Sequence, residues 1–98
     1  MAGTEADAAR TAAAQLEALA RNLEGRGYSS RQVSVGPHQG ILVVNRAVPE
    51  LAETIRVAPV LFGDWWFWWS WNDPIAPASD VDAAAFKIAH VLTVKAPD

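Results

Sequence analysis

The seven residues from Trp65 to Trp71 constrain the fold of this chain more than any other segment. They read WWFWWSW and hold six aromatic side chains, among them all five tryptophans of the sequence. Aromatic residues favour β-strands, in which successive side chains point to opposite faces of a sheet. We therefore expect a strand here with bulky apolar side chains on both faces, and the rest of the chain has to cover them.

The residues before this segment predict its partner strand. Gly63-Asp64 is a Gly-X pair, typical of a two-residue type II′ turn, and the segment Glu53 to Phe62 alternates apolar and polar residues. Because proline cannot donate to a sheet ladder, Pro59 indicates an edge or a bulge there. The expected antiparallel register pairs Phe62 with Trp65, Pro59 with Trp68, Ala58 with Trp69 and Arg56 with Trp71.

Apolar residues at helical spacing predict a helix at each end of the chain. The first runs from Thr4, its expected N-cap, to about Glu24, and Gly25 or Gly27 ends it. The second begins at the capping pattern Ser79-Asp-Val-Asp82 and runs to about Leu92. Its expected buried stripe consists of Val81, Ala84, Ala85, Ile88, Val91 and Leu92.

Two further strands are expected between the first helix and the aromatic pair. They are Arg31 to Val35 and the more apolar, more central Gly40 to Asn45, joined by a Gly-Pro-His-Gln loop, while the segment from Asn72 to Pro77 is expected to be a loop. The order of elements predicts an α+β fold, a four-stranded antiparallel meander with an N-terminal and a C-terminal helix on one face. The length of 98 residues suits a single domain, 1–98.

Two amphipathic helices can cover only one face of such a sheet. Each aromatic side chain buries 150–250 Å², so an uncovered row of them would form an apolar patch of the kind that usually marks a binding surface. We predict a contact surface on the face that carries the odd-numbered aromatic residues. The candidate contact residues are Trp65, Phe67, Trp69, Trp71, Phe62, Val60 and Arg56.

The sequence allows three interpretations of this aromatic face. The first hypothesis is a homodimer, because two-fold assemblies are the commonest and a flat aromatic strand is self-complementary; a different protein could equally be the partner. A small-molecule site, for a sugar or an aromatic metabolite that stacks on tryptophan beside Asn72, Asp73 and Arg56, is the alternative. A third interpretation makes the aromatic strand part of the core, with loops folded over the remainder.

Residues with catalytic or ligating chemistry are few and scattered. The two histidines, His38 and His90, have no carboxylate at metal-ligand or triad spacing, and cysteine is absent. The acidic residues Asp73, Asp80 and Asp82 are explained by turn and capping roles. No nucleophile elbow, phosphate loop or dinucleotide fingerprint occurs, so we predict a non-enzymatic protein without catalytic residues, metal or cofactor.

Charge and hydropathy bear on localisation and on partners. The net charge is −3 and the eight Lys and Arg are scattered singly, which argues against direct binding of nucleic acid. The N-terminal segment lacks the apolar stretch of a signal peptide, and no apolar run approaches the ~18 residues of a membrane span. We expect a cytoplasmic protein that has no membrane partner.

The C-terminal third resembles a known group of sequences. FWWSW, followed by IAPASD and by a helix that ends in HVL, is similar to a group of small actinobacterial hypothetical proteins that are often encoded beside helix-turn-helix regulators. That group has no established activity, so the resemblance implies no function and no site residue for this chain. The element order also resembles the dimeric type III secretion chaperone-like fold, a likeness of layout only.

Overall fold

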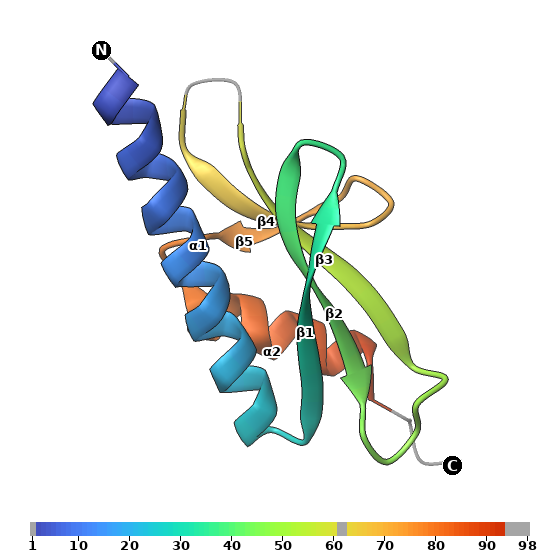
Figure 1. The fold of residues 1–98 in the computed structure, drawn as a ribbon. Coiled ribbons are helices and arrows are strands. Elements are labelled where there is room, and N and C mark those ends of the chain that lie inside the picture. Colours follow the sequence, from blue (N-terminus) through green and yellow to red (C-terminus); the bar gives the residue numbers. More distant parts are fainter. Residues whose placement is uncertain (1, 61–62, 94–98) are drawn as a thin grey trace.

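A computed structural model describes residues 2–60 and 63–93 of the chain (Figure 1). Within these residues the chain forms two helices and one five-stranded antiparallel sheet, in the strand order β1-β2-β3-β4-β5. The fold is therefore α+β, with a helix at each end. The elements are α1 (Ala2–Gly25), β1 (Tyr28–Val35), β2 (His38–Asn45), β3 (Ala52–Pro59), β4 (Trp65–Trp69), β5 (Pro74–Pro77) and α2 (Val81–Val91).

Helix α1 follows the apolar stripe that the sequence predicts. Its buried residues are spaced three and four apart, which is the spacing of one helical face. The helix ends at Gly25, and the chain turns at Gly27, whose φ of 101° suits a residue without a Cβ. The buried residues of α1 are Ala12, Leu16, Leu19 and Leu23.

One core joins both helices to a single face of the sheet. The buried side chains of β2, β3 and β4 on that face pack against those of α1 and α2. Side-chain hydrogen bonds tie α2 and its C-cap to the strands: Tyr28 Oη donates to the Ala89 carbonyl at 3.1 Å, Asn45 Nδ2 to the Leu92 carbonyl at 2.8 Å, and Lys87 Nζ to the Ile75 carbonyl at 2.8 Å. The central strand residues of this core are Ile41, Val43, Ile55, Val57 and Phe67.

The sheet has five strands where the sequence predicted four. The segment expected as a loop contains β5, which pairs with β4 through Trp66–Pro77 and Phe67–Ala76, with a bulge between Phe67 and Trp68. Its two prolines fit because β5 is an edge strand, where one side of the backbone needs no donor. The buried side chains of Ile75 and Ala76 explain why this short segment is fixed against the core.

The register between β3 and β4 differs from the predicted one. Pro59 lies opposite Trp65, Val57 opposite Phe67 and Ile55 opposite Trp69, a shift of three residues. The cause is the connection, since Val60 N donates to the Asp64 carbonyl and Gly63 N donates to the Val60 carbonyl, so the loop spans 60–64 rather than two residues. An odd shift exchanges the faces of every side chain on β4 relative to β3.

The tight two-residue hairpin lies elsewhere in the sheet. Val35 pairs with His38, so β1 and β2 are joined by Gly36-Pro37 alone, and Gly36 has a φ of 58°. A glycine with positive φ at the first central position is what a type II′ turn requires. The short turn lets β2 begin at His38, two residues earlier than predicted, and β1 is longer at its other end, where it begins at Tyr28.

Helix α2 begins at Val81, and its N-cap is Asp80 rather than Ser79. The Asp80 carboxylate accepts a hydrogen bond from Ala83 N at 3.1 Å. Most of the predicted stripe is buried, but Val91 is 47% exposed. No helix among the described residues is long and apolar enough to cross a membrane.

Candidate interaction face of the sheet

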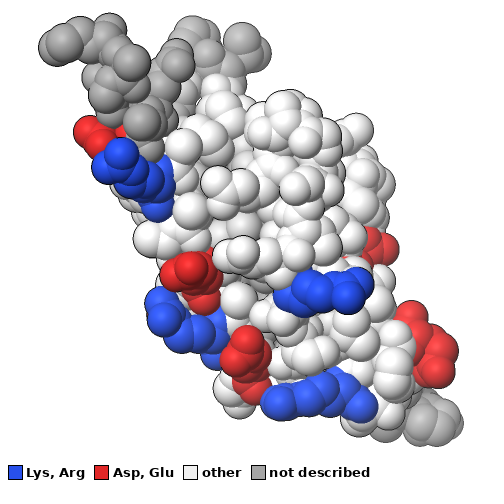
Figure 2. Space-filling model, in the orientation of Figure 1, with Lys and Arg blue, Asp and Glu red and all other residues white. Residues whose placement is uncertain are grey.

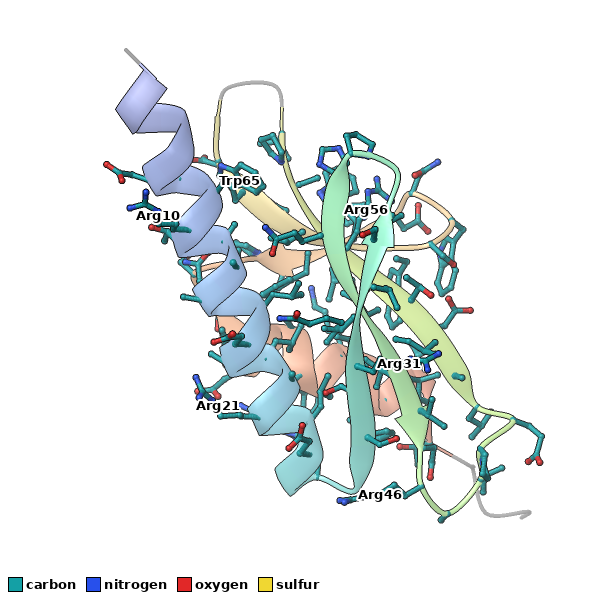
Figure 3. All side chains as sticks on the ribbon, viewed as in Figure 1. Arg10, Arg21, Arg31, Arg46, Arg56 and Trp65 are labelled. Atoms are coloured by element: carbon teal, nitrogen blue, oxygen red, sulfur yellow. The ribbon has the colours of Figure 1, made fainter. Side chains whose placement is uncertain are left out.

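Strand β4 sends its side chains alternately to the two faces of the sheet. Phe67 is fully buried and Trp69 is 7% exposed, and both belong to the core beneath the helices. Trp65 is half-buried on the same face, beside α1 (Figure 3). The structure therefore places three of the predicted contact residues on the covered face, because the register shift turns them towards the helices.

The opposite face of the sheet is not covered by the helices, and we call it the open face. It carries the side chains that alternate with the core residues, and the pairing of the strands places them in rows across β1 to β4. Nearly all of its apolar members are half-buried, shielded by one another and by the sheet. The apolar members of the open face are Val33, Val35, Leu42, Val44, Ala52, Ala58, Trp66 and Trp68.

Arg56 and Trp68 form the centre of the open face. They lie opposite each other on β3 and β4, and the guanidinium carbon stands 5.2 Å from the centre of the Trp68 ring, within cation–π range. Arg56 Nη1 also donates to the Trp69 carbonyl at 3.2 Å, and Trp68 Nε1 donates to the Ala58 carbonyl at 3.1 Å. These bonds hold both side chains against neighbouring backbone and satisfy the indole N–H of Trp68.

Trp71 follows β4 and lies beside Trp69, half exposed to solvent. It is 49% exposed, and its ring stacks on Trp69 with centroids 4.8 Å apart and planes 7° apart. Its Nε1 donates to Asp73 Oδ2 at 3.0 Å, which holds the ring in place. Trp71 therefore presents a fixed aromatic surface to solvent. The predicted pairing of Trp71 with Arg56 is wrong, because Arg56 lies on Trp68.

The two remaining candidate contact residues lie at the connection between β3 and β4. Val60 is half-buried in that connection, and Phe62 lies outside the described residues. The structure thus does not gather the seven candidates on one surface. The sequence analysis missed Trp66, Trp68 and the open-face residues of β1 and β2. Their alternation with the core residues is visible in the sequence, but the register between the strands, which places them on the open face, is not.

The acidic residues near α2 have structural partners. Asp73 accepts from Trp71, Asp80 caps α2, and Asp82 accepts from Asn22 Nδ2 at 2.8 Å, a bond that joins the two helices. Over residues 2–60 and 63–93, no three His, Asp or Glu side chains gather as a metal site would require.

No family model matches the chain, and the searches of curated proteins and of solved structures also found no match. The functional argument therefore rests on the surfaces of the molecule itself.

Proposed function

We propose that the protein is a non-enzymatic interaction protein that works as a homodimer, with the open face as its contact surface. One observation carries this proposal: both helices pack on one face of the sheet, while the other face bears a continuous set of apolar side chains that includes Trp66 and Trp68. A large apolar patch on a small domain usually marks a protein contact.

The chemistry of the open face suits a second copy of itself. Two sheets pack face to face with their side chains interdigitated, at a separation of about 10 Å. Two charged side chains of β1 to β4 lie on the open face: Arg56 at its centre lies over Trp68 and bonds to a carbonyl, and Arg31 lies on the edge strand β1, opposite Leu42. The centre of the face therefore brings no unbonded charge to a second copy. An isologous two-fold contact would bury the same residues on both copies.

The experiment is a measurement of mass in solution by light scattering over a range of protein concentrations. The wild-type protein should be a dimer, and Trp68→Glu and Leu42→Glu should both give folded monomers, since each places a charge in the contact. Gln32→Glu, on an exposed residue of β1 whose side chain points to the other face, is the control and should remain a dimer. A monomeric wild type at the highest concentration would refute the homodimer.

A second candidate function, a small-molecule platform, is favoured by the geometry of Trp71. One side of its ring is stacked on Trp69 while the residue stays half exposed, and Asp73 fixes the ring by a hydrogen bond. Pre-oriented rings of this kind stack on sugars and aromatic metabolites. Titration with a panel of such compounds should quench tryptophan emission in the wild type and not in Trp71→Ala; equal quenching in both proteins would exclude this platform.

A further inference from the structure

The two halves of the open face differ in the size of their side chains. The strand pairing sets these side chains in rows across β1 to β4. Both tryptophans of the face lie on β4, whereas Gly40 on β2 adds no side chain at all. In the central rows the β3–β4 half is therefore bulky and the β1–β2 half is small. One central row is Val33–Gly40–Arg56–Trp68, and the next holds the pairs Val35–His38 and Ala58–Trp66.

Two identical sheets that pack face to face can be related in two ways. In aligned packing the strands of the two sheets stay within about 30° of each other, so the two-fold axis between the sheets runs either across the strands or along them. An axis across the strands stacks each strand on its own copy, β1 on β1 and β4 on β4. An axis along the strands, between β2 and β3, stacks β1 of each copy on β4 of the other.

The sizes of the side chains favour the axis along the strands. With that axis Trp68 of one copy faces Val33 of the other copy, and Arg56 faces Gly40, so the bulky half of the row meets the small half. An axis across the strands would bring the β4 tryptophans of both copies to one border and hold the two β1 borders apart. Protein contacts pack as densely as protein interiors, which argues against such a gap.

The two arginines of the open face favour the same axis. Arg31 is exposed on β1 (Figures 2 and 3), and the open-face positions of β1 to β4 include no Asp or Glu. An axis across the strands would place both copies of Arg31 on stacked strands, where like charges repel. An axis along the strands places them at opposite borders of the contact. The Arg56 guanidinium lies over Trp68, so it also points away from an axis between β2 and β3.

We propose that the two copies of the dimer are related by a two-fold axis that runs along the strands between β2 and β3, so that β1 of each copy lies on β4 of the other. This arrangement rests on the proposed function, since it presupposes that the open face closes a homodimer. It gives each open-face tryptophan a contact in the second copy: Trp68 lies against Val33, and Trp66 lies against Val35. Arg31 is the residue whose charge disfavours the other axis.

A pair of opposite charges within one chain tests the contact of Trp66 with Val35. In a single copy these residues lie three strand spacings apart, about 14 Å, so their side chains can meet only across the dimer. Trp66→Glu and Val35→Lys should each raise the dissociation constant of the dimer by about a hundredfold, because each buries an unpaired charge in the contact. The double variant Trp66→Glu/Val35→Lys should dimerise about tenfold more tightly than either single variant, since each carboxylate then faces an ammonium group.

The matched control is the double variant Trp66→Glu/Val35→Glu, which should dimerise no more tightly than Trp66→Glu alone. Arg31→Ala is a second and independent measurement, on an exposed residue whose loss leaves the fold intact. It should change the dissociation constant by less than about threefold, because the two copies of Arg31 stand at opposite borders. Sedimentation equilibrium measures the dissociation constants, and far-ultraviolet circular dichroism confirms that each variant is folded.

The possible failures can be told apart. A dimer that both single variants weaken and the oppositely charged double variant does not restore would leave the homodimer standing and refute the arrangement alone. Tighter association of Arg31→Ala would place the axis across the strands, which also refutes it. A monomeric wild type would overturn the homodimer and the arrangement together, as would a dimer that responds neither to Trp66→Glu nor to Val35→Lys, because its contact would then lie away from the open face.

Discussion

Two pairs of similar residues in this chain differ in a single contact. Ser79 and Asp80 are both exposed and adjacent, yet only Asp80 accepts the hydrogen bond from Ala83 N that begins α2. Gly25 and Gly40 are both glycines, yet a Cβ at Gly25 would meet nothing, whereas one at Gly40 would lie 2.6 Å from the Ile55 carbonyl oxygen. Each pair gives a matched experiment.

Asp80→Ala should lower the free energy of unfolding by about 1 kcal/mol, because it removes the side-chain acceptor at the N-cap of α2. Ser79→Ala should change it by less than about 0.5 kcal/mol, as expected for an exposed residue without such a role. Urea denaturation followed by circular dichroism measures both. A larger loss for Ser79→Ala than for Asp80→Ala would contradict the cap seen in the structure.

Gly40→Ala should destabilise the protein by about 1–3 kcal/mol, since backbone has to move to admit the methyl group. The obstacle is the Ile55 carbonyl, with the Val35 side chain 3.0 Å away on another side. Gly25→Ala should be neutral or slightly stabilising, because alanine favours a helix and the position is open. Thermal unfolding at equal protein concentration measures both variants, and equal midpoints for the two would disprove the close approach of β2 to β3.

At the scale of elements, β4 is the strand whose successive side chains lie in the core and on the open face. Phe67 lies in the core, and its neighbour Trp68 lies on the open face. The same kind of substitution should therefore act on folding at one position and on assembly at the other. This separation comes from the period of two along a strand.

Phe67→Asp should prevent folding or give insoluble protein, because an isolated carboxylate would be buried among apolar side chains at a cost of several kcal/mol. Trp68→Glu should keep a native far-ultraviolet spectrum and a cooperative unfolding transition. The two circular dichroism spectra and melting curves make the comparison. A folded Phe67→Asp variant together with an unfolded Trp68→Glu variant would mean that Trp68, and not Phe67, points into the core.

At the scale of the whole molecule, one sheet has one covered and one open face, and assembly should be visible in its tryptophans. Trp66 and Trp68 are on the open face, Trp69 is in the core and Trp71 stands in solvent on its outer side. A change in emission on dilution can therefore be assigned to a surface.

If the open face closes a dimer, emission should shift to the red when the protein is diluted through its dissociation range, because Trp66 and Trp68 become hydrated. Trp68→Phe should reduce that shift, and Trp71→Phe should leave it unchanged. Fluorescence spectra across the dilution series provide the measurement. If the emission maximum does not depend on concentration and the mass stays at that of one chain, the protein is a monomer and the open face closes no dimer.

The sequence by itself determined the local elements, because their signals lie within a few residues. Leu16, Leu19 and Leu23 recur at helical spacing, so α1 follows from its stripe, and the alternation in β3 follows from its own residues. The fold class and the helices on one face were predictable for the same reason. An uncovered apolar surface on β4 was also predictable, because the aromatic strand has bulky side chains on both faces and two helices can cover only one face of the sheet.

Tertiary structure decided which side chains of β4 lie on the face that the helices leave uncovered. A five-residue connection at 60–64 replaces the expected two-residue turn, and the resulting odd shift buries Phe67 and Trp69 and leaves Trp66 and Trp68 on the open face. β5 likewise forms because Ile75 and Ala76 reach the core and β4 has a free side, and neither fact is local. Register and pairing depend on contacts between distant residues, so no property of the aromatic segment alone could fix them.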